Sequence, residues 1–195
     1  MIKTTAMLCA ELKDYEMPLA KISRMMKDGE IIQIVRGLYE TDRSVPGYLL
    51  AGSIYGPSYL SFEFALSYHG MIPEAVYTFT SATCSKRKSK KYETPFGVFT
   101  YKDIPVEAYP FGVELKEENG YYYSIATPEK SLCDMLHSVK KMNNRKEIIS
   151  LLFDDLRIDE EKLLSLNIED IGQYAELYRN ANIDKLYRYL RGLKK

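Results

Sequence analysis

The stretch that decides the N-terminal fold is KISRMMKDGEIIQIVRGLY, residues 21–39. Its first half places Ile22, Met25 and Met26 at positions i, i+3 and i+4, so three apolar side chains share one face of a helix. Pro18 suits the first turn of this helix, where a backbone N–H would have no partner within the helix. Gly29 should end the helix, because glycine readily adopts the left-handed conformation of a C-terminal cap.

The second half of the stretch predicts a two-stranded ribbon. Ile32 and Ile34 alternate with their neighbours at the period of a strand. Arg36-Gly37 favours a tight turn, and Leu38-Tyr39 can return as the second strand. A helix with a cationic face followed by a hairpin is typical of a winged helix-turn-helix that binds DNA.

We expect the helix that begins at Pro18 to lie in the major groove, with the ribbon turn on the adjacent backbone. The candidate DNA-binding residues are Lys21, Ser23, Arg24, Lys27 and Arg36. Arginine can make paired hydrogen bonds to guanine, and lysine neutralises phosphates. An arginine at a ribbon turn can reach the minor groove, where the potential is most negative. The alternative is an ordinary amphipathic helix with a solvated charged face, and the neighbouring acidic residues reduce the local field.

Composition bounds the class of protein. The chain has 195 residues, enough for one large domain or two small ones, and its hydrophobic fraction of 46% supports a packed core. The formal net charge is +0, which argues against nucleic-acid binding by bulk charge alone but allows a local basic surface.

The cysteines and the apolar runs exclude several classes. Cys9, Cys84 and Cys133 are far apart, so we expect free thiols in a reducing cytosol and no structural zinc site. No apolar run reaches the roughly 20 residues of a membrane span, and the N-terminal run is too short for a signal peptide. We therefore expect a cytoplasmic protein without a membrane partner, a metal or a cofactor.

The rest of the chain predicts an α+β fold in two domains. A polar, turn-rich segment at 41–47 separates a winged helix-turn-helix domain (1–45) from a mixed α/β domain that ends in a helical bundle (46–195). Ser61 should cap a helix that runs to His69, and Thr127 should cap another. The expected strands are 76–80, 106–109, 121–126 and 92–101, the last of which Pro95 and Gly97 interrupt, with a hairpin turn at 118–120. From Asn143 onward only helices are expected, including one capped by Asn167 and a last one capped by Asn182.

Five blocks together resemble the AbiE-type antitoxin family of bacterial abortive-infection systems. The blocks are residues 21–39 above, YLSFEFALSYHGMIPE (59–74), YTFTSAT (77–83), YETPFGVFTY (92–101) and IATPEKSLCD (125–134). They occur in the order of the family and lie within most of residues 17–137. Each block alone is a weak signal, and the specificity comes from their order.

The resemblance implies a function that the composition does not show. In that family an N-terminal winged helix binds operator DNA and represses the protein's own operon. A C-terminal domain counteracts a toxin that resembles nucleotidyltransferases, without a stable complex between the two, in the type IV mode. We therefore expect a non-enzymatic antitoxin and autorepressor, present as a monomer or a weak dimer. An alternative is a winged-helix transcriptional regulator that has no toxin partner.

A second cationic stretch follows the third block. It consists of Lys86, Arg87, Lys88, Lys90 and Lys91, between two expected strands. This loop can contact phosphates beside the winged helix, or RNA, or an acidic partner. A solvated loop that balances acidic helices explains it equally well. The last helix is also basic, up to Lys194 and Lys195, and cations near a helix C-terminus are explained by the helix dipole.

An enzyme is the remaining class. Asp103 followed by Glu114-Leu115-Lys116 fits the loose spacing of a metal-dependent nuclease, in which two carboxylates hold the metal and a lysine assists. Such a string arises often by chance in a chain with 28% charged residues. We explain Glu63, Glu129 and Asp134 by helix starts and exposed faces instead. We therefore expect no catalytic residues.

Overall fold

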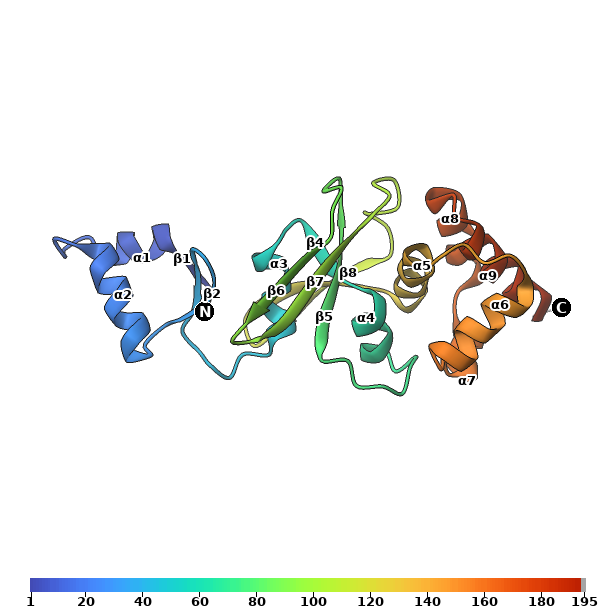
Figure 1. Cartoon of the computed structure of the whole chain (residues 1–195), viewed down its shortest axis with the longest axis horizontal. Helices are drawn as coiled ribbons and strands as arrows, with labels where there is room; N and C mark the ends of the chain where they lie inside the picture. The colour runs from blue at the N-terminus through green and yellow to red at the C-terminus, as the bar shows by residue number, and fades with distance from the viewer. Residues whose placement is uncertain (194–195) are drawn as a thin grey trace.

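The computed structural model describes residues 1–193 and shows a mixed α+β protein with two sheets, so the predicted α+β class is confirmed. Figure 1 shows three parts in a row along the long axis: an N-terminal unit, a central sheet and a group of C-terminal helices. The helix α5 (Pro128–Ser138) lies between the sheet and those helices.

The N-terminal unit follows the predicted helix and ribbon closely. Its elements are β1 (Lys3–Thr4), α1 (Thr5–Glu11), α2 (Pro18–Asp28), β2 (Ile32–Val35) and β3 (Leu38–Glu40). Gly29 caps α2 with φ of 74°, as predicted. The strands form an antiparallel sheet in the order β1-β3-β2. Helix α1 begins at Thr5, because the two preceding residues pair with β3.

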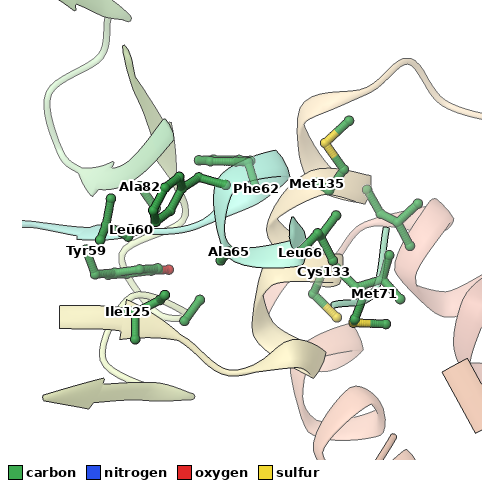
Figure 2. Packing of buried hydrophobic residues seen from close by; sticks show 14 of the residues in the cluster. Tyr59, Leu60, Phe62, Ala65, Leu66, Met71, Ala82, Ile125, Cys133 and Met135 are labelled. Carbon is green, nitrogen blue, oxygen red and sulfur yellow. The ribbon is translucent and has the colours of Figure 1, made fainter. Parts of the chain in front are cut away.

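The central sheet has six strands in the order β6-β7-β5-β4-β9-β8. They are β4 (Ser58–Leu60), β5 (Thr78–Cys84), β6 (Lys90–Thr94), β7 (Gly97–Ile104), β8 (Val113–Glu118) and β9 (Tyr121–Ala126). The pairs β5–β7 and β4–β9 are parallel, and the other pairs are antiparallel. Figure 2 shows α4 (Phe62–Tyr68) packing its Leu66 toward Cys133 of α5, next to Met71. The sheet and these two helices share one large core.

Residues 92–101 form two strands where one interrupted strand was predicted, and residues 106–109 form none. Residues 92–101 belong to two antiparallel strands, β6 and β7, because Pro95 cannot donate to a ladder and Gly97 has φ of 121°. Residues 106–109 form a turn, in which the N–H of Ala108 donates to the carbonyl of Pro105 at 3.1 Å. The hairpin turn before β9 is confirmed, since Asn119 and Gly120 have φ of 53° and 77°.

The C-terminal part of the described chain consists of helices, one π-helical turn and short connections. Its helices are α6 (Arg145–Ser150), α7 (Glu160–Ser165), α8 (Ile168–Tyr178) and α9 (Ala181–Leu193), and 151–155 is a π-helical turn. Asn167 caps α8 as predicted. Asn182 does not cap α9: it lies buried inside the helix, where its side-chain oxygen accepts from the N–H of Met142 at 2.8 Å. Asn180 accepts from the N–H of Asn182 instead. The final Lys194 and Lys195 lie outside the described residues.

The N-terminal unit has a small core of its own and joins the sheet through apolar and polar contacts, since Ile34 of β2 belongs to the large core. Leu8, Ile22, Ile31 and Tyr39 form a small hydrophobic cluster, separate from the large core. The buried Glu40 accepts from the N-terminal ammonium group, from two backbone N–H groups and from the hydroxyl of Tyr121 in β9 at 3.0 Å. The predicted domain border at residue 45 stays a prediction.

Candidate nucleic-acid interface

Helix α2 has one buried face and one exposed face. Ile22 is 2% exposed and lies in the small core, and Met25 and Met26 pack partly buried against it. On the other side Leu19 is 63% exposed, and Lys27 is also exposed. The helix is therefore held by three apolar side chains and presents its remaining surface to solvent.

The cations of α2 differ in how free they are. Arg24 and Lys27 are exposed, and neither has an ion-pair partner within residues 1–193. Lys21 is partly buried, and its ammonium group lies 4.0 Å from the carboxylate of Glu30, which offsets part of its charge. Arg24 and Lys27 are consequently the two helix cations that are most available to a ligand.

Ser23 uses its proton within the helix. Its hydroxyl donates to the carbonyl of Leu19 at 3.1 Å, one turn earlier. Such a bond is common for a helical serine and leaves the oxygen only as an acceptor. Ser23 is therefore placed on the exposed face, as expected, but its donor is already engaged.

The β2–β3 hairpin presents Arg36 at its tip. Gly37 has φ of 84°, which glycine adopts without strain, so the predicted turn is confirmed. The carbonyl of Gly37 accepts from the N–H of Thr5 at 3.1 Å, so the tip is fixed to the start of α1. Arg36 is exposed, and in the described chain it has no ion-pair partner.

Two features near α2 were not predicted. A guanidinium nitrogen of Arg43 lies 3.6 Å from where a side chain on Gly29 would begin, so a third arginine reaches the C-terminal end of α2. Tyr15, Met17 and Leu19 are each at least half exposed just before and at the start of the helix. The run Y-E-M-P-L places these large side chains just before and at the start of α2, off its buried face, and that pattern was a usable signal.

The structure disperses the five cations of the second basic stretch. The ammonium group of Lys86 donates to the carbonyl of Gly56 at 3.1 Å and lies over the ring of Tyr55. Lys91 pairs with Glu93 at 2.7 Å on β6. Arg87 and Lys88 instead line a hollow next to His137, at the C-terminal end of α5. Since α5 lies on the far side of the sheet from α2, the loop does not extend the surface of α2 (Figure 1).

The nuclease constellation does not assemble. Asp103 is on β7 and Glu114 is on β8, and three other strands separate these two. Four strand spacings of about 4.8 Å put the two carboxylates roughly 19 Å apart, too far to share one metal ion. Glu114 pairs with Lys116 at 3.3 Å. Within residues 1–193, no three His, Cys, Asp or Glu side chains lie close enough together to hold a metal ion.

A buried polar cluster connects the sheet, α5 and α8, and the sequence did not reveal it. Asp134 was explained by an exposed face, but the side chains of Asp134 and Lys130 are both 0% exposed. The two carboxylate oxygens of Asp134 accept from Tyr178, from Tyr59 at 3.0 Å and from Ser61 at 2.5 Å. The ammonium group of Lys130 lies 3.6 Å from Asp134. We call these five residues the buried cluster.

The ammonium group of Lys130 makes two hydrogen bonds in this buried region. Lys130 donates to the carbonyl of Ala108 at 2.7 Å and to the hydroxyl of Tyr178. Burial lowers the pKa of Lys130 and Asp134 acts to raise it, while burial and Asp134 both raise the pKa of Tyr178. Ser61 was expected to cap α4, but its hydroxyl goes to Asp134, and Thr80 accepts from the N–H of Phe64 instead.

Comparison with known proteins identifies no family for this chain. No protein-family model matches the chain, and no curated protein matches it. None of the helices in residues 1–193 is both long and apolar enough to span a bilayer.

Proposed function

We propose that the protein is a sequence-specific DNA-binding repressor of its own operon. The observation that carries the proposal is the exposed face of α2, where Arg24 and Lys27 have no ion-pair partner among the described residues, next to the hairpin that presents Arg36. An α-helix fits the major groove of B-DNA, and an arginine on it can pair with guanine.

The order of the elements supports a winged helix-turn-helix. Two helices precede the β2–β3 hairpin, and the short β1 pairs with β3, so the hairpin lies beside the helices. In such a protein the second helix enters the groove and the hairpin contacts the adjacent backbone. Residues 1–43 contain as many Asp and Glu as Lys and Arg, so binding would depend on a few placed contacts.

One copy of α2 covers one half-site. An inverted-repeat operator would therefore take two copies, either as a dimer or as monomers that bind cooperatively. A monomer or weak dimer in solution suits either case.

The antitoxin role rests on the five blocks, and the buried cluster gives one of them a physical meaning. The block 125–134 contributes Lys130 and Asp134, which connect the sheet to α8. This block therefore serves the stability of the C-terminal part, which would act against a nucleotidyltransferase-like toxin without a stable complex. A gene for such a protein next to this one, and rescue of its toxicity by co-expression, would support the role. If neither the neighbouring gene nor the rescue is found, the protein is a regulator without a toxin partner.

A reporter assay tests the repressor. The region upstream of the gene is fused to a reporter, and the protein is supplied from a second plasmid. We expect repression by the wild-type protein and its loss with Arg24→Ala combined with Arg36→Ala, at equal protein levels. Lys13→Ala combined with Lys140→Ala is the matched control, since both lysines are exposed and lie off α2 and the hairpin. Equal reporter activity with and without the wild-type protein would contradict the proposal.

A further inference from the structure

A hollow of about 350 Å³ lies between the second basic stretch and the end of α5. Its cationic and hydroxyl lining consists of Arg87, Lys88, Ser89, Lys102, His137 and Ser138, and we call it the loop–α5 pocket. The residues come from the β5–β6 loop, from β7 and from α5, which are far apart in sequence. Pockets of roughly 300–1,000 Å³ are the usual size for small ligands.

Asp103 shapes the pocket without neutralising it. One of its carboxylate oxygens accepts from the hydroxyl of Thr83 at 2.7 Å, and the other accepts from the N–H of Arg87 at 2.5 Å. Both oxygens therefore hold the loop, in which Ser85 and Arg87 have positive φ of 59° and 57°. The side chains of Arg87 and Lys88 have no ion-pair partner in residues 1–193.

The charge of the pocket is positive in sum. Lys102 lies 3.8 Å from the carboxylate of Glu63, beyond hydrogen-bond distance, and so keeps free donors. Three permanent cations stand against Asp103, against Glu63 beside Lys102 and against the roughly half negative charge at the C-terminal end of α5, which leaves a small net positive charge. When Nδ1 of His137 accepts from Asn180 at 3.4 Å, Nε2 carries a proton that it can donate.

We propose that the loop–α5 pocket binds a terminal phosphate group, carried either by a free nucleotide or by the end of a nucleic-acid strand. A phosphate monoester carries a charge of about −1.5 to −2 at pH 7, so it would pair with Arg87 and Lys88, whose side chains have no ion-pair partner in residues 1–193. No Phe or Tyr lines the pocket within the described chain, so it would recognise the phosphate and not the base. This activity is separate from the proposed operator binding, because the pocket is lined by the end of α5, and α5 lies on the other side of the sheet from α2 (Figure 1).

The test is isothermal titration of the full-length protein with pyrophosphate, with a mononucleotide, and with one short single-stranded oligonucleotide that carries either a 5′ phosphate or a 5′ hydroxyl. We expect binding that requires the phosphate. Binding of the mononucleotide assigns the pocket to a free nucleotide, and binding of the phosphorylated strand alone assigns it to a strand end. The proposal would be overturned if no probe binds at millimolar concentration. It would also be overturned if the protein does not bind the mononucleotide and binds the phosphorylated and the unphosphorylated strand equally.

Matched variants place the binding in the pocket. Arg87→Ala combined with Lys88→Ala should weaken phosphate binding about tenfold or more, as expected for lost charged hydrogen bonds. Lys90→Ala combined with Lys91→Ala removes the same charge from the same stretch outside the pocket, and should leave binding within about twofold. If both pairs of substitutions weaken phosphate binding equally, the effect comes from net charge alone, and the proposal that the pocket binds phosphate is overturned. If the first pair fails to fold in a thermal scan, Lys102→Gln takes its place. Operator binding should be unchanged in all three, which separates this test from that of the repressor.

Discussion

Helix α2 and helix α5 both carry cations, and they use them in opposite ways. On α2 the side chains of Arg24 and Lys27 lie in solvent without an ion-pair partner in the described chain. On α5 the side chain of Lys130 is 0% exposed, donates to a carbonyl and to a tyrosine hydroxyl, and lies 3.6 Å from the carboxylate of Asp134. A buried cation must be paired for the fold to be stable, whereas an exposed cation without a partner is available to a ligand.

The largest effect is expected from substitutions in the buried cluster, which should lower the stability of the fold. Asp134→Leu leaves the charge of Lys130 without a counter-ion, and Lys130→Met does the converse, so each should lower the free energy of unfolding by about 3–5 kcal/mol. The double variant should recover much of that loss, because no unpaired charge remains. Urea unfolding measures all three. Single variants that each lose less than about 1 kcal/mol would show that the cluster is not essential to stability.

Substitution of an exposed cation on α2 should weaken DNA binding and leave the stability of the fold unchanged. Lys27→Ala should weaken binding to upstream and unrelated duplexes alike and should reduce the slope of log K against log salt by about 1, as expected for one lost phosphate contact. Its unfolding free energy should stay within about 0.5 kcal/mol of wild type. Lys21→Ala is the matched control on the same helix and should change the slope less, because Glu30 already offsets its charge. An unchanged slope for Lys27→Ala would remove this lysine from the interface.

The contact between the N-terminal unit and the sheet through Glu40 should depend on pH. Burial of Glu40 acts to raise its pKa, but hydrogen bonds from the N-terminal ammonium, from Asp42, Thr41 and Tyr121 lower it below the ordinary 4.5. The unfolded state therefore binds more protons in this range, so the stabilisation is present above about pH 4.5 and is lost as the pH falls through the lower folded value. Unfolding free energies of the wild type and Glu40→Gln between pH 3 and 7 measure it. A wild-type profile as flat as that of the variant would contradict the assignment.

The smallest effect is expected at Ser23. Its hydroxyl is exposed and bonds within its own helix, so Ser23→Ala should change the unfolding free energy by no more than about 0.5 kcal/mol. Affinity for upstream DNA should change by less than about threefold, because no donor is lost from the surface. A larger loss of affinity with unchanged stability would show that the serine oxygen accepts a bond from DNA.

Local patterns predicted the N-terminal unit well. The apolar spacing of Ile22, Met25 and Met26, the glycine after them and the alternation in 32–35 are short-range signals, and the structure has α2, its cap and the hairpin where they indicate. The tight turn at 118–120 and the cap of α8 by Asn167 were likewise local and confirmed.

The buried cluster could not be predicted in the same way. Lys130 and Asp134 stand four residues apart, which is also the spacing of an ordinary surface ion pair. Their burial depends on α5 being covered on both sides, by the sheet and by the C-terminal helices (Figure 1). The partners Tyr59 and Tyr178 are 75 and 44 residues away from Asp134. Such a layer is set by tertiary packing, which a window of the sequence does not contain.

The most direct test of the account is the affinity of the protein for its own upstream duplex relative to a scrambled duplex, measured in one titration series for the wild type and for Arg24→Ala. We predict that the wild type prefers the upstream duplex and that Arg24→Ala loses about 1–3 kcal/mol on that duplex alone, as expected for a lost paired bond to guanine. An equal loss on both duplexes would show that Arg24 contacts only phosphate. Equal affinity of the wild type for the two duplexes would contradict the proposal that α2 reads an operator.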